Sequence, residues 1–99
     1  MGKKLTSVFT DNMDACIFTG CNVVERHHII GKTRGNKELC EKYGFIVPLR
    51  PDLHPNGARA DIRYSKQIDE HLKKMAQEYF ESHYGNREDW MRLFGRNYL

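Results

Sequence analysis

The residues of this chain best suited to chemistry are three histidines that flank two short apolar runs. His27 and His28 lie at the end of the first run, and His54 lies just beyond the second run, at residues 45–49. If the two runs pair as strands, all three imidazoles can meet at one end of the pair. A loop rich in glycine and basic residues joins the runs. Histidines that converge beside such a loop indicate a metal-assisted attack on phosphate.

Length and composition indicate one small soluble domain. The chain has 99 residues, of which 39% are hydrophobic and 29% are charged. That length fits one domain with a modest core, and the composition argues against disorder. The net charge of +3 is a mild bias toward polyanions and does not by itself identify a nucleic-acid binder.

Neither a membrane segment nor a disulfide framework is expected. No stretch approaches the ~20 apolar residues of a membrane span, and no apolar run follows the N-terminal lysines as a secretory signal would require. Cys16, Cys21 and Cys40 form an odd set, so we expect reduced, small buried side chains rather than a structural zinc site. These features predict a cytoplasmic protein with no membrane partner.

Two strands must position the histidines. Residues 1–13 are mostly polar and predict a loosely attached N-terminal arm on a single domain at 14–99. Residues 23–30 and 45–49 are rich enough in β-branched and apolar side chains to form strands. Pro48 limits the second of these to a short or edge strand.

The loop between the strands has to let adjacent histidines act together. Neighbouring side chains of a regular strand point to opposite faces, so the first strand must end or distort near His28, and Gly31 makes that plausible. Residues 31–42 predict a loop, with a helical turn near 38–42.

The C-terminal half predicts helices. An apolar stripe favours a helix from about Ala60 or Ser65 to Tyr84. Its members are Ile68, Leu72, Met75, Ala76, Tyr79 and Phe80. Asn86 predicts the cap of a second, short helix that ends at Gly95, with Trp90 and Phe94 in the core.

In this order of strand, loop, strand and helix, the sequence resembles the HNH, or ββα-metal, nuclease family. The resemblance runs from about residue 16 to residue 99 and lies mainly in segments 25–29 and 41–49. The ending at 94–99 is similar to that of small HNH-type proteins common in bacteriophage genomes. The resemblance implies an α+β fold with a ββα-metal core: a short β-hairpin crossed by a long helix, and a C-terminal helix nearby.

The family's chemistry is hydrolysis of a phosphodiester with one divalent metal ion. Carried over, it implies His27 as a metal ligand, His28 as the general base and His54 as a second ligand at the start of the helix. Asp61 stands in the region where phage relatives often carry a further histidine, and its carboxylate suits Mg²⁺ or Mn²⁺. Zn²⁺ and Ni²⁺ are the alternatives.

The chain departs from the family pattern in two further places. Tyr43 and Gly44 stand where the base-orienting asparagine is usual, and Asn36 is the nearest asparagine. Many relatives hold a zinc knuckle in two Cys-x-x-Cys pairs, whereas Thr19 stands where the partner of Cys16 would fall. We therefore expect no structural zinc.

Basic residues concentrate around the proposed site and predict contacts with DNA phosphates. The candidates are Arg26, Lys32, Arg34, Arg59 and Arg63, with Arg34 and Arg59 as clamps.

Three functions remain open on the sequence. The first is a metal-dependent DNA endonuclease or nickase, phage-encoded and active in the host cytoplasm, with a protein partner or a homodimer supplying specificity. The second is a non-catalytic HNH-like protein that binds DNA or inhibits a host protein. The third is a structural mini-domain whose histidines bind zinc and whose fold is lost when the metal is stripped.

Overall fold

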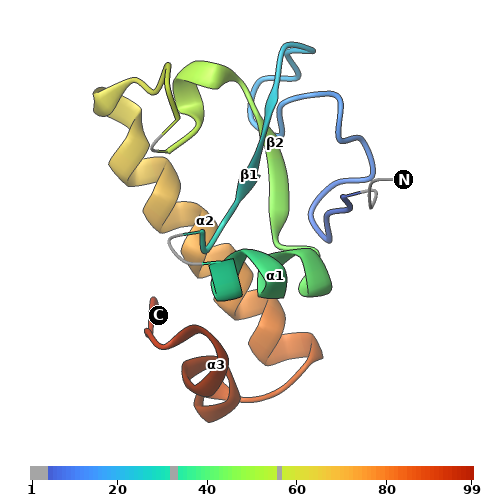
Figure 1. Cartoon of the computed structure of the whole chain (residues 1–99), viewed down its shortest axis with the longest axis vertical. Coiled ribbons are helices and arrows are strands. Elements are labelled where there is room, and N and C mark those ends of the chain that lie inside the picture. The colour runs from blue at the N-terminus through green and yellow to red at the C-terminus, as the bar shows by residue number, and fades with distance from the viewer. Residues whose placement is uncertain (1–4, 32–33, 56) are drawn as a thin grey trace.

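The computed structural model describes residues 5–31, 34–55 and 57–99. Within these ranges the fold is α+β, with three α-helices and one two-stranded antiparallel sheet (Figure 1). The elements in chain order are β1 (Glu25–His28), α1 (Arg34–Tyr43), β2 (Ile46–Leu49), the 3₁₀ helix η1 (Pro51–Leu53), α2 (Ile62–His83) and α3 (Arg87–Phe94).

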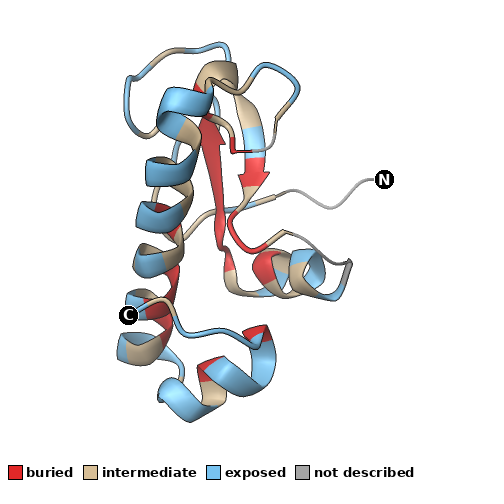
Figure 2. Cartoon of the chain, turned by 90° about the vertical axis from the view of Figure 1, so that its left-hand side faces the viewer, coloured by how far each residue is buried: buried red, intermediate tan, exposed pale blue. Residues whose placement is uncertain are grey.

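The strand pair forms the centre of the fold. Glu25 pairs with Leu49 and His27 with Val47, so these four side chains share one face of the sheet. Every residue of β2 is buried, whereas β1 contributes only His27 to the buried set. In Figure 2, β2 is coloured as buried along its whole length and lies between α2 and its partner strand β1. The apolar strand therefore holds the polar one in place.

The long helix α2 covers the sheet with the stripe that the sequence predicted. Leu72, Ala76 and Phe80 are buried on this face, and its outer face is exposed (Figure 2). The three other predicted stripe residues, Ile68, Met75 and Tyr79, are partly buried against the same core. The predicted helix from about residue 60 or 65 to residue 84 is thereby confirmed.

Helix α3 also begins and ends as predicted. Asn86 accepts a hydrogen bond from the backbone N–H of Asp89, whose carboxylate accepts one from the Asn86 N–H, which completes a capping box. Gly95 adopts the left-handed conformation at the other end, with φ 79°. The helix buries Trp90 and Phe94, as expected.

The connection between the strands differs from the sequence prediction. A ten-residue helix, α1, occupies most of the segment expected to be a loop with one helical turn. The sequence did not predict this helix because Gly35 and Asn36 are poor helix formers. The helix is fixed by packing instead: Cys40 is fully buried, and Leu39 and Tyr43 lie against the core on the same side.

The N-terminal segment lies against the core. The Val8 N–H donates to the Gly44 carbonyl at 2.9 Å, and the Phe9 ring stacks on Phe45 with centroids 6.1 Å apart.

Among the residues that the structure describes, no helix is both long and apolar enough to cross a bilayer.

Two glycines of similar backbone conformation test the docking of residues 7–9. Gly44 and Gly95 both have positive φ, so alanine at either position should cost about 1–2 kcal/mol of unfolding free energy. A Cβ on Gly44 would also lie 2.9 Å from Val8 Cγ1, whereas a Cβ on Gly95 meets nothing within 4 Å. We therefore expect Gly44→Ala to cost at least about 1 kcal/mol more than Gly95→Ala in urea denaturation. Equal costs would show that this segment is not docked in solution.

Candidate functional site

His27 is a buried histidine whose side chain lacks a partner. It is the third residue of β1, and its exposed fraction is 7%. The Nε2 atom is fully buried and has no hydrogen-bond partner within the described residues. Buried polar atoms are nearly always satisfied, and an unsatisfied one costs about 1–3 kcal/mol. An imidazole nitrogen without a hydrogen-bond partner is suited to coordinate a metal ion or accept a hydrogen bond from a ligand.

His54 lies beside His27 and is oriented by a carboxylate. The two rings have centroids 4.9 Å apart and an interplanar angle of 65°. His54 follows η1 directly, and its Nδ1 lies 2.7 Å from Oε1 of Glu25 on β1. Because an ionised carboxylate can only accept, Nδ1 is the donor of this contact, and in a neutral imidazole the lone pair is then on Nε2. A metal-binding histidine usually has its other ring nitrogen hydrogen-bonded to a carboxylate in this way.

His28 occupies the last position of β1. The chain bends directly after it, at Ile29 and Ile30. The strand therefore ends at His28, as expected if two adjacent histidines are to act at one site. The Ile30 N–H donates to Sγ of the buried Cys40, which anchors this bend to α1. Nε2 of His28 lies 3.6 Å from Oε1 of Glu41, also on α1. This distance is too long for a strong hydrogen bond, so the carboxylate orients the ring only loosely.

Burial keeps the His27 imidazole neutral. Loss of solvation lowers the pKa of His27 from its usual 6.5 to about 3. The nearby charges of His54, His28 and Lys73 add to the effect in the same direction. A neutral imidazole at neutral pH has the lone pair that a metal ion needs.

The three histidines line one pocket of about 730 Å³. The α2 helix contributes Lys66, Asp69, Glu70 and Lys73 to its wall, α1 contributes Lys37, and the C-terminal segment contributes Arg96 and Tyr98. Four of these wall residues are basic and two are acidic, and one of the acids, Asp69, is paired with Lys73 at 2.8 Å. The pocket therefore combines imidazoles with an excess of positive charge.

Asp61 lies outside this pocket lining. Its side chain caps α2 by accepting from the Arg63 N–H, and its carboxylate accepts from the Arg63 guanidinium at 2.7 Å. That hydrogen bond lowers the pKa of Asp61 below its ordinary value. Its oxygens are thus taken up by the helix start and by Arg63, one of the expected DNA contacts.

The other predicted site residues have varied positions. Asn36 lies on α1 and outside the pocket lining. Arg26 is half-exposed, with a guanidinium nitrogen 3.7 Å from the Asp14 carboxylate, and Arg59 is exposed. Arg34 begins α1, and Lys32 lies outside the described residues.

Several site residues were missed by the sequence prediction, although a signal existed for some. Glu25 precedes His27 by two positions, which places both on one strand face. Lys66, Glu70 and Lys73 recur at helical spacing and so share one stripe of α2. Nothing in the sequence indicated that Arg96 would return to the pocket.

The donor set is suited to a metal ion but is small. His27 and His54 are close enough for both rings to share one ion, and the open Nε2 of His27 is the observation that favours this. No cluster of three or more His, Cys, Asp or Glu side chains suited to hold a metal occurs within residues 5–31, 34–55 and 57–99. Water or a phosphate oxygen would have to complete the coordination of such an ion.

Comparison with known proteins gives no assignment. No protein-family model, curated protein or solved structure matches this chain. The case for function therefore depends on the geometry of the pocket.

The pKa of His27 predicts an acid-sensitive fold. Because the folded-state pKa lies below the unfolded value, the unfolded chain takes up the proton first as pH falls below 6.5. Unfolding free energy should therefore drop between pH 6.5 and about 3, by roughly 2–3 kcal/mol at pH 4.5 from this group alone. A His27→Leu variant should lack this part of the drop, whereas the exposed His71→Leu control should keep it.

The measurement is urea denaturation at pH 7 and pH 4.5, with chelator present. The same loss of stability in His27→Leu and in the unsubstituted protein would contradict a buried neutral His27.

Proposed function

We propose that this chain is a metal-dependent DNA endonuclease or nickase of the HNH type, encoded by a bacteriophage. The observation that carries the proposal is the buried Nε2 of His27, which lacks a hydrogen-bond partner among the described residues and lies beside the carboxylate-oriented ring of His54. The surrounding pocket supports it, because basic side chains next to histidines are suited to a phosphodiester. The order of two antiparallel strands followed by a long helix is the order expected of a ββα-metal core.

In this proposal His27 and His54 hold a single divalent ion, and Glu25 orients His54. Such an ion supplies Lewis-acid stabilisation of charge on the scissile phosphate and the leaving oxygen. The expectation of Mg²⁺ or Mn²⁺ depended on a carboxylate ligand from Asp61. A site of two imidazoles gives Zn²⁺, Ni²⁺ and Mn²⁺ more weight relative to Mg²⁺.

His28 serves as the general base. It lies next to the ligand His27 and lines the same pocket, so its imidazole can reach a water molecule beside a bound phosphate. Within residues 5–31, 34–55 and 57–99 no asparagine lines the pocket, and Glu41, at 3.6 Å from His28, is the described group best placed to orient the ring. Asn36 on α1 remains the family-based candidate for that role.

The non-catalytic alternative rests on a specific observation. Asp61 is engaged with Arg63, so of the three predicted metal ligands only His27 and His54 lie together at the pocket. An HNH-like scaffold with a weakened metal site could still bind DNA, or bind a host protein as an inhibitor. The structural-zinc alternative differs in that it predicts a large fall in melting temperature on addition of chelator.

Cleavage of supercoiled plasmid tests the proposed activity. We expect nicking with at least one of Mg²⁺, Mn²⁺, Ni²⁺ or Zn²⁺, and none with chelator. His28→Ala should slow nicking about 100-fold or more, because it removes the general base. The His71→Ala control, an exposed histidine outside the pocket, should cleave at the unsubstituted rate. No nicking with any metal, from protein shown to be folded, would favour the non-catalytic alternative.

Calorimetric titration with Zn²⁺ and Mn²⁺ tests the ligand assignment. We expect a single site that His27→Leu or His54→Leu abolishes. Glu25→Gln should weaken binding about 10- to 100-fold, because the oriented tautomer of His54 loses its carboxylate. The matched control is Glu78→Gln on the exposed face of α2. Equal affinities for the two glutamine variants would contradict the role of Glu25 in orienting the His54 ring.

A further inference from the structure

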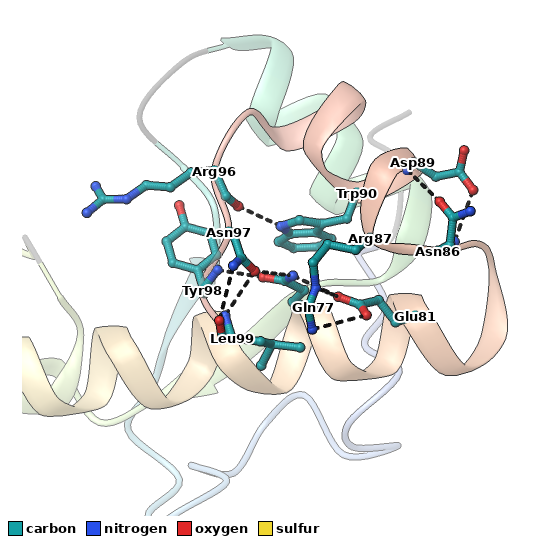
Figure 3. A network of polar contacts seen from close by, with 10 residues as sticks. All are labelled: Gln77, Glu81, Asn86, Arg87, Asp89, Trp90, Arg96, Asn97, Tyr98 and Leu99. Atoms are coloured by element: carbon teal, nitrogen blue, oxygen red, sulfur yellow. Dashed lines mark hydrogen bonds and ion pairs between the residues drawn. The ribbon is translucent and has the colours of Figure 1, made fainter.

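The C-terminal segment 95–99 is held against α2 by one buried side chain. Gln77 is fully buried, and both the oxygen and the nitrogen of its side-chain amide are hydrogen-bonded. Its Oε1 accepts from the Tyr98 N–H at 2.6 Å, and its Nε2 donates to Asn97 Oδ1 at 2.8 Å and to Glu81 Oε2 at 2.7 Å (Figure 3). A buried amide satisfied in this way fixes the backbone that it contacts.

A second hydrogen bond fixes the same segment from α3. The indole N–H of Trp90 donates to the Arg96 carbonyl at 2.7 Å (Figure 3). Because Trp90 is fully buried in the aromatic core, this hydrogen bond anchors the backbone of Arg96 to that core. The side chains of Gln77 and Trp90 thus both hydrogen-bond to the backbone of segment 95–99. Apolar packing of the core would not by itself require these two polar contacts.

These contacts bring two side chains to the pocket. Arg96 and Tyr98 line the same cavity as the histidines. The Arg96 guanidinium lies 5.8 Å from the centre of the Tyr98 ring, and Lys73 Nζ lies 5.4 Å from it. The ring therefore holds two cations near each other at the pocket wall. Arg96 makes no ion pair with a carboxylate in the described part of the chain, unlike Arg26, Arg63 and Lys73.

From this geometry we infer that segment 95–99 is the phosphate-binding wall of the pocket, with Arg96 as a DNA contact and Gln77 as its positioning residue. The inference rests on the proposed function and goes further, because it assigns substrate binding to residues outside β1, β2 and η1, the elements that carry or precede the three histidines. An arginine suits this role because its planar fork of donors matches phosphate oxygens. The contact would position the DNA backbone without reading its sequence.

Binding of a fluorescein-labelled DNA duplex, followed by fluorescence anisotropy in the presence of chelator, tests the inference without cleavage. Arg96→Gln should weaken binding about five- to tenfold at 0.1 M salt, and should reduce the slope of log K against log salt by about 0.9. Arg92→Gln is the matched control, because it removes the same charge from an exposed arginine paired with Asp89 on α3. It should leave the slope nearly unchanged.

Gln77→Met tests the positioning role. It removes no charge, yet it should reduce the salt slope as Arg96→Gln does, because Arg96 is no longer held at the pocket. The control is Gln67→Met, an exposed glutamine of α2, which should bind like the unsubstituted protein. If Gln77→Met fails to fold, Arg96→Gln against Arg92→Gln decides the inference alone.

The outcomes separate this inference from the proposed function. Equal slopes for Arg96→Gln and Arg92→Gln, or no DNA binding by the unsubstituted protein, would overturn it. Plasmid nicking together with equal slopes would overturn the inference and leave the nuclease. A reduced slope for Arg96→Gln without nicking by any metal would support the wall and remove the hydrolytic activity.

Discussion

The antiparallel register of β1 and β2 is the constraint on which the site depends. Strand β1 has no apolar side chain and is held by a partner strand that is entirely buried. The register places Glu25 and His27 on the same sheet face as Leu49 and Val47, which are fully buried. His27 is buried on that face, and its Nε2 atom lacks a partner among the described residues, which costs free energy that a purely structural strand would avoid. The fold thus maintains an unsatisfied imidazole at the floor of a pocket.

The other elements act on that imidazole through packing. Helix α1 fixes the bend after β1 by burying Cys40 against Ile30, which lets His28 face the same pocket as its neighbour. Helix α2 crosses the sheet with its apolar stripe and carries a charged stripe beside it. The C-terminal segment closes the wall because Gln77 and Trp90 hold its backbone. Residues far apart in the chain therefore line the pocket that contains His27, His28 and His54.

Much of the fold was predictable, because its signals are local. The stripe of α2 follows from periodicity, and the ends of α3 follow from Asn86 and Gly95, whose roles depend on neighbouring backbone alone. Helix α1 was not predictable in full, since Gly35 and Asn36 disfavour it and tertiary burial of Cys40 stabilises it. The meeting of His27, His28 and His54 could be expected from strand pairing. The return of Arg96 could not, since it depends on one long-range amide contact.

Nitrogen NMR of the histidine side chains during metal titration tests the central claim most directly. We expect that, without metal at neutral pH, His27 is neutral and the Nδ1 of His54 that faces Glu25 carries a proton. Addition of Zn²⁺ should shift the ring nitrogens of His27 and His54 together at one stoichiometric equivalent, with His71 unchanged. Ring signals of His27 and His54 that do not respond to Zn²⁺, or a protonated His27 at neutral pH, would contradict the account.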